Sequence, residues 1–65
     1  MFININDKTF NALYIQSLEP ENVTIEGLTV YNINYKLQNG SVIIESFSTA
    51  EERDEKFNSV INLSI

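Results

Sequence analysis

The sequence predicts an α+β fold, in which an antiparallel sheet of about four to five strands carries one C-terminal helix packed on one face. Three observations predict it. Residues 29–37 alternate between apolar and polar side chains, which is the pattern of a half-buried strand. Asn39-Gly40 then favours a tight hairpin turn into a second strand over residues 41–47. Residues 49–61 combine a capping sequence with an apolar stripe at helical spacing, which predicts the helix.

The first half of the chain is expected to supply the remaining strands. Residues 1–5 form a short strand, and Asn6-Asp7 turns the chain back. A second strand is predicted over residues 8–18, although a helix through residues 10–18 fits the same apolar spacing. Pro20 is expected to end this segment in a loop, with a brief edge strand after it, before Glu26-Gly27 breaks the chain ahead of the long hairpin.

The long hairpin leaves two pairing registers open. With a two-residue turn, Tyr35 lies opposite Ile44. With Gly40 in a bulge, Tyr35 lies opposite Ile43 instead. Because a shift of one residue exchanges the two faces of a strand, the register decides which side chains of the second strand point toward the helix.

The helix start is predicted from its capping residues. The Ser48 hydroxyl is placed to accept from the amide of Glu51, whose carboxylate reaches back. Glu52 and Lys56 are spaced for an i,i+4 ion pair. The side that packs on the sheet is expected to consist of Ala50, the stem of Arg53, Phe57, Val60 and Ile61.

Composition narrows the classes of function. The chain of 65 residues is expected to form a single domain, residues 1–65. It contains no cysteine and no histidine, so disulfides are excluded and the commonest metal ligand and general base are missing. The net charge of −5, from nine acidic and four basic residues, argues against direct binding of nucleic acid or of an anionic membrane. The sequence lacks a membrane span and the basic start of a signal peptide, which predicts a cytoplasmic protein.

No group of side chains predicts catalysis, a cofactor or a metal. The serines lack a histidine partner, and two glycines cannot form a phosphate-binding loop. The four carboxylates within residues 51–55 suit the positive end of a helix and lack the spacing of a calcium loop. Tyr14, Tyr31 and Tyr35 are interpreted as core or interface residues. The sequence therefore predicts a protein that is not an enzyme and needs no cofactor.

The last third of the chain, about residues 39–61, joins a hairpin turn and an aromatic strand end to an acidic helix start. The residues that carry this pattern are Asn39-Gly40-Ser41, Ile43 or Ile44, Phe47, Thr49, Glu51-Glu52-Arg53-Asp54, Phe57 and Val60. The pattern resembles the tail of many small bacterial and phage proteins. This resemblance implies a compact sheet with one C-terminal helix and a bacterial host cell, and it implies no activity.

The first functional hypothesis is a small acidic protein-binding module, a modulator or inhibitor of a host protein. Such a module would present carboxylates to a basic groove. The hypothesis requires the acidic side chains outside the helix to converge on one surface, and the candidates are Glu19, Glu21, Glu26 and Glu45.

The second hypothesis is a self-associating homodimer without a separate target. One helix covers only one face of a sheet, and the consecutive apolar residues 42–44 must occupy both faces. An apolar surface is therefore expected, and such a surface usually marks an interface. The candidate contacts are Val30, Ile43, Phe47 and Tyr14.

Overall fold

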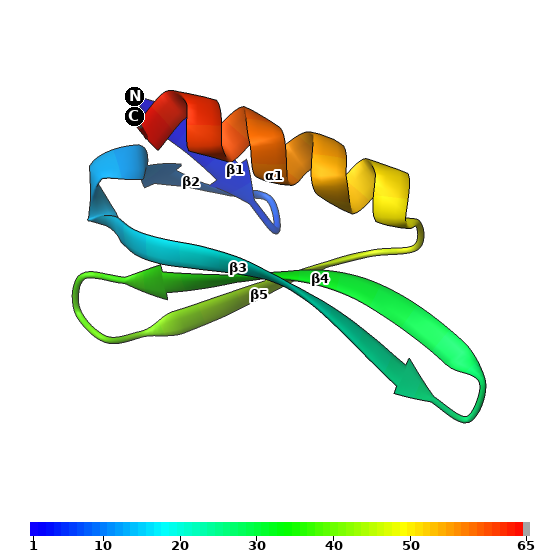
Figure 1. The fold of residues 1–65 in the computed structure, drawn as a ribbon. Helices are drawn as coiled ribbons and strands as arrows, with labels where there is room; N and C mark the ends of the chain where they lie inside the picture. The colour runs from blue at the N-terminus through cyan, green and yellow to red at the C-terminus, as the bar shows by residue number, and fades with distance from the viewer. Residues whose placement is uncertain (65) are drawn as a thin grey trace.

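The computed structural model describes residues 1–64 and has the predicted α+β architecture with one C-terminal helix (Figure 1). The elements in chain order are β1 (Phe2–Ile5), β2 (Lys8–Asn11), the 3₁₀ helix η1 (Ala12–Tyr14), β3 (Ile15–Ile25), β4 (Leu28–Leu37), β5 (Val42–Phe47) and α1 (Ala50–Ser64). Within residues 1–64 the strands form two sheets: β1 pairs with β2, and β3, β4 and β5 form a separate antiparallel sheet in that order. The helix and the β1–β2 hairpin lie together on one face of the three-stranded sheet (Figure 1).

The strand predicted over residues 8–18 is interrupted by η1, and the competing helix over residues 10–18 is wrong as well. The side chain of Asn11 caps the 3₁₀ turn by accepting from the amide of Leu13 at 3.0 Å. The amide of Ala12 donates to the carbonyl of Met1 at 2.8 Å, which closes the first hairpin. The turn thus carries the chain from the two-stranded sheet to the three-stranded one.

Pro20 does not end a strand, contrary to the prediction, because β3 continues through it to Ile25. Pro20 lies opposite Ile33 of β4, and within residues 1–64 no strand pairs with the other side of β3. The alternation of an antiparallel ladder turns the backbone nitrogen of Pro20 away from β4. A proline is tolerated at such a position because no ladder hydrogen bond is lost.

The register of the β4–β5 hairpin is the bulged one. Tyr35 lies opposite Ile43, and Gly40 adopts a φ of +89°. The amide of Gly40 donates to the carbonyl of Leu37 at 3.0 Å, and the amide of Leu37 donates to the carbonyl of Ser41 at 2.8 Å. Glycine is favoured here because a side chain disfavours this left-handed backbone conformation.

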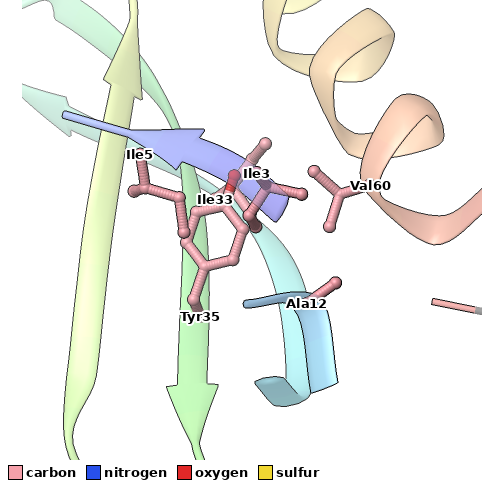
Figure 2. Packing of buried hydrophobic residues seen from close by; sticks show 6 residues of the cluster. All are labelled: Ile3, Ile5, Ala12, Ile33, Tyr35 and Val60. Atoms are coloured by element: carbon pink, nitrogen blue, oxygen red, sulfur yellow. The ribbon is translucent and has the colours of Figure 1, made fainter. Parts of the chain in front are cut away.

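The core lies between the three-stranded sheet and the layer formed by α1 and β1–β2 (Figure 2). Tyr35 and Ile33 of β4 are fully buried, and Ile5 and Val60 cover them from β1 and α1. The remaining members of the cluster are Ile3 and Ala12. Phe57 and Ile61 are half-buried at the predicted stripe positions, and Arg53 is buried there.

The helix cap is displaced by one residue from the prediction. Thr49, and not Ser48, accepts from the amide of Glu52, with an N to Oγ1 distance of 3.2 Å. The Glu52 carboxylate accepts from the hydroxyls of both Thr49 and Ser48, at 3.0 and 3.3 Å. Lys56 does not form the predicted pair with Glu52, since its ammonium group turns inward to Glu45 of β5.

Candidate protein interface

The outer face of the β3–β4–β5 sheet, opposite α1, carries a polar centre with aliphatic residues at its ends. Its residues are Ser17, Glu19, Glu21, Val23 and Ile25 of β3, Leu28, Val30, Asn32, Asn34 and Lys36 of β4, and Val42, Ile44 and Ser46 of β5. At the centre, the Asn34 amide donates to the Glu21 carboxylate at 3.3 Å. Helix α1 and the β1–β2 hairpin both lie on the opposite side, so neither covers this face (Figure 1).

One end of the outer face belongs to a projecting ribbon, defined as residues 23–30. In this ribbon β3 and β4 pair only with each other, because β5 reaches no further along β4 than Tyr31. The ribbon extends past the end of β5 (Figure 1). Val23 pairs with Val30 and Ile25 with Leu28, which places four aliphatic side chains on one side. Leu28 is 75% exposed and Ile25 is 68% exposed.

The turn of the ribbon holds Glu26 in the left-handed backbone region. Its φ is +51°, and Gly27 follows with a φ of +81°. Glycine adopts this conformation freely, whereas a glutamate there stores strain. The exposed tip of the ribbon therefore combines a strained acidic residue with exposed aliphatic neighbours.

The second feature is the free edge of β5. The hydrogen bond from the Leu37 amide to the Ser41 carbonyl sets the alternation of bonded and non-bonded pairs along the β4–β5 ladder, so Ile43 and Glu45 bond to β4. The backbone groups of Val42, Ile44 and Ser46 consequently point away from the sheet. The hydrogen bond from Nδ2 of Asn6, in the β1–β2 turn, to the Ile44 carbonyl at 3.0 Å agrees with this, because it approaches β5 from outside the sheet.

The fold places Arg53 inside the molecule. Its side chain is 9% exposed, and its Nε donates to Asp54 at 2.7 Å. Its Nη1 donates to Oδ1 of Asn22 at 3.0 Å and contacts the backbone carbonyl of Asn32 at 3.4 Å. The guanidinium also lies 5.7 Å from the centre of the Tyr31 ring, within range of a cation–π contact. Arg53 therefore ties the start of α1 to β3 and β4.

Lys56 is also used internally, in a network with Glu45 and Tyr35. Its Nζ donates to Oε2 of Glu45 at 3.0 Å and to the carbonyl of Asn4 at 2.6 Å. The hydroxyl of the fully buried Tyr35 donates to Oε1 of the same carboxylate at 2.6 Å. Burial, followed by the Glu45 carboxylate, raises the pKa of Tyr35 well above its usual value. This tyrosine is consequently held neutral, as a hydrogen-bond donor in the core.

The surface is more acidic than the net charge of −5 indicates. Eight of the nine carboxylate residues are exposed, and Glu45 is the buried one. Of the four cationic residues, only Lys8 and Lys36 are exposed in the part of the chain that the structure describes. The exposed charges are thus mostly negative, which favours encounters with positively charged partners.

The structure brings together only some of the predicted site residues. Glu19 and Glu21 share the outer face, and Glu26 lies at the ribbon tip. Glu45 points to the opposite side and is 8% exposed, so the four carboxylates do not converge as one cluster. The reason is the bulged register, which turns residue 45 inward to meet Lys56.

The structure also places only some of the predicted apolar contact residues on the outer face. Val30 lies on the outer face, whereas Ile43 and Phe47 pack partly buried against the core, so these two cannot form the uncovered surface. The exposed residues of β5 are Val42 and Ile44. Sequence reasoning missed these two because their exposure depends on the bulge at Gly40, one of the two registers that the sequence allows.

Tyr14 is exposed and lies apart from the outer face, in η1. It borders an open pocket of about 520 Å³, whose lining is Phe10, Tyr14, Leu37, Gln38 and Asn39. The lining contains no charged side chain. The pocket therefore offers apolar contact area beside the polar side chains of Gln38 and Asn39.

Comparisons of the chain with known protein families, with curated proteins and with solved structures find no match. Within residues 1–64 there is no group of acidic, histidine or cysteine side chains that could hold a metal ion. No helix in the described part of the chain has the length and apolar character needed to cross a membrane.

Proposed function

We propose that this protein is a non-catalytic protein-binding module that recognises a basic partner protein and modulates or inhibits it. The observation that carries the proposal is the aliphatic side of the projecting ribbon, with Ile25 and Leu28 largely exposed. A two-stranded ribbon is marginally stable in water by itself, and exposed aliphatic area on it favours a partner that covers it.

The charge of the neighbouring residues supports a basic partner. Glu19 and Glu21 lie on the same face as the aliphatic residues, and Glu26 forms the tip. Two of the four cationic residues, Arg53 and Lys56, are held on the inner side, and Lys36 is the cation that shares the outer face with Glu19 and Glu21. A partner with an apolar centre and lysine or arginine around it would complement this surface.

The test is a comparison of two leucine variants that differ only in position. Leu28→Ser removes an aliphatic group from the ribbon, and Leu13→Ser removes an equally exposed one from η1. Proteins retained by the immobilised chain from a lysate of its source organism are purified, and their dissociation constants are measured by calorimetry. We expect saturable binding that weakens about tenfold for Leu28→Ser, from the loss of about 1.5 kcal/mol of apolar burial, and changes less than about twofold for Leu13→Ser.

The proposal also predicts how charge affects the same measurement. Replacing Glu19 and Glu21 by glutamine should weaken binding and reduce its dependence on salt. Labelled duplex DNA should not bind at physiological ionic strength, because few exposed cations are present to neutralise phosphates. Equal affinities for wild type, Leu28→Ser and Leu13→Ser would refute recognition through the ribbon.

A second candidate function is the self-associating homodimer, and the uncovered outer face is the observation that favours it. Val42 and Ile44 are more than half exposed on that face. Light scattering over a concentration series distinguishes the two functions. A dimer that Ile44→Asp converts to a monomer would support self-association, and a monomer at all concentrations would exclude it.

A further inference from the structure

We infer that the free edge of β5 accepts an extended, basic segment of the partner protein as an added strand. The inference builds on the proposed function, since it specifies the kind of segment that a basic partner would contribute. Added strands bind through backbone hydrogen bonds to an exposed sheet edge, and side-chain contacts on the two faces give the specificity. The β5 edge supplies both kinds of contact.

The two edges of the three-stranded sheet differ in how they are protected. Natural sheets discourage pairing at their edges with proline, bulges and charged residues. The β3 edge has all three, namely Pro20, an irregular register between Ile15 and Ser17, and the carboxylates Glu19 and Glu21. The β5 edge is a regular run, Val42–Phe47, with no proline and with its single charged residue, Glu45, turned inward. The β5 edge is therefore the one open to a further strand.

The outward backbone groups of β5 belong to Val42, Ile44 and Ser46, whose side chains all lie on the outer face. In an antiparallel pair, residues that exchange two hydrogen bonds lie directly opposite each other with side chains on the same face. The residues of an added strand that bond to β5 would thus place their side chains beside Val42 and Ile44, where aliphatic groups fit. The alternate residues would point to the inner side.

The inner side of the β5 edge is acidic. A shallow hollow of about 340 Å³ lies between β5 and α1, lined by Phe47, Glu52, Glu55, Lys56 and Ser59. Lys56 is engaged with Glu45 and Asn4, which leaves Glu52 and Glu55 to set the charge of the rim. Lysine or arginine at every second position of an added strand would reach this rim. The favoured segment therefore alternates aliphatic and basic residues.

A second copy of the chain fits this edge less well. Two β5 strands paired about a two-fold axis would place both helices on the same side of a joined sheet. Glu52 and Glu55 of each copy would then border the same seam, and like charges facing each other oppose association. A basic segment removes this repulsion and replaces it with attraction.

The β1–β2 turn contacts the middle of the β5 edge. Asn6 occupies the Ile44 carbonyl with its side-chain amide, and Asn6 is exposed and has a φ of +52°. An incoming strand would replace this hydrogen bond with one from its own backbone. Asn6→Gly keeps the turn conformation and removes the side-chain amide, so it is expected to tighten binding about two- to fivefold.

The test uses synthetic peptides of about seven residues that alternate lysine and valine, with binding measured by fluorescence anisotropy. Two isomers of equal charge carry N-methyl groups, one on the valine amides and one on the lysine amides. We expect the valine-methylated peptide to bind at least tenfold more weakly than the parent, because those amides face β5. The lysine-methylated peptide should bind like the parent, because its methyl groups face solvent.

The matching variant of the protein is Ile44→Pro. Its amide points away from β4, so proline removes no ladder bond, as at Pro20 in β3. We expect the variant to retain its circular dichroism spectrum and to bind the parent peptide at least tenfold more weakly. Glu55→Gln should weaken binding about threefold, and the control Glu26→Gln at the ribbon tip should not change it.

Equal binding of the two methylated isomers would overturn strand addition even if Ile44→Pro failed to fold, and so would the absence of peptide binding. A wild-type dimer that Ile44→Pro converts to a monomer would assign the edge to a second copy and overturn the basic segment. Capture of a partner that depends on Leu28 but not on Ile44 would leave the proposed function standing and refute this inference alone.

Discussion

Replacing Tyr35 by phenylalanine should remove a large part of the stability of this small domain. The change deletes one oxygen atom from a fully buried side chain and leaves its ring in place. The hydroxyl donates to Oε1 of Glu45 at 2.6 Å, and a hydrogen bond to a charged group contributes about 1.5–3 kcal/mol. Because Lys56 still holds Oε2 at 3.0 Å, the carboxylate keeps one partner, and we expect a loss of about 2 kcal/mol.

This loss is a substantial fraction of the total. A domain of 65 residues has a free energy of unfolding of roughly 3–10 kcal/mol. A loss of about 2 kcal/mol should lower the melting temperature by about 8–16 °C. The assay is urea and thermal unfolding followed by circular dichroism. Tyr14→Phe is the matched control, because it makes the same chemical change at a side chain that is 62% exposed, and it should shift stability by less than about 0.5 kcal/mol.

A double-mutant cycle tests the assignment to Glu45. Tyr35→Phe removes the donor and Glu45→Leu removes the acceptor of one hydrogen bond, so their effects should fall short of additivity by about 1 kcal/mol or more. If Tyr35→Phe behaves like Tyr14→Phe, the network does not stabilise the fold and the reasoning is refuted. Additive effects of the two changes would refute the direct coupling.

Three further predictions concern pH, backbone strain and the buried cation. The pKa of Tyr35 lies above its unfolded value of 10.0, so the contribution of Tyr35 to the free energy of unfolding is complete below about pH 10 and falls by about 1.4 kcal/mol per pH unit above it. The difference in urea stability between wild type and Tyr35→Phe should therefore narrow above pH 10. A constant difference would contradict this. Glu26→Asn should stabilise the chain by about 0.5–1 kcal/mol in urea unfolding, since asparagine tolerates the φ of +51° better; a loss of stability would refute the strain. Arg53→Met should lower the free energy of unfolding by about 2–3 kcal/mol in the same assay. Arg53→Lys should recover little of this loss, because lysine lacks the planar guanidinium that reaches Asn22 and the backbone carbonyls. Full recovery by lysine would show that the charge alone suffices.

The parts of the fold that the sequence predicts well are those decided by neighbouring residues. The alternation of residues 29–37 and the Asn39-Gly40 turn are complete within a short stretch, and β4 and the hairpin appear where they were predicted. The helix is also predicted from a short stretch, although its cap is Thr49, whose hydroxyl accepts from the amide of Glu52. Boundaries differ by a residue or a few because both candidate caps have the required chemistry.

The parts that failed depend on the neighbours of each strand in space. A proline breaks a central strand but is tolerated in an edge strand, and the sequence does not say that β3, which contains Pro20, is an edge strand. The division into two sheets follows from the 3₁₀ turn at residues 12–14, whose apolar spacing also fits a strand or a helix. In both cases the outcome depends on tertiary contacts, which local sequence patterns do not specify.

The prediction of the candidate interface was wrong in part for the same reason. Ile43, Glu45 and Phe47 alternate on one side of β5, and only the bulge register places that side under α1. A carboxylate on an inner strand position is costly without a partner, so the register and the Lys56 contact must be known together. The exposed pair Val42 and Ile44 follows once the register is fixed.

The proposed partner contact has two parts, and they should differ in their response to salt. Exposed carboxylates attract a basic partner from a distance, and this steering weakens as the Debye length falls from about 10 Å at 0.1 M to about 3 Å at 1 M salt. Backbone hydrogen bonds along β5 form only after contact and are not screened in this way. Raising the salt should therefore slow association of the lysine–valine peptide, whereas Ile44→Pro should mainly speed its dissociation, as measured by stopped-flow anisotropy. If Ile44→Pro slows association and leaves dissociation unchanged, the β5 edge does not hold the bound segment.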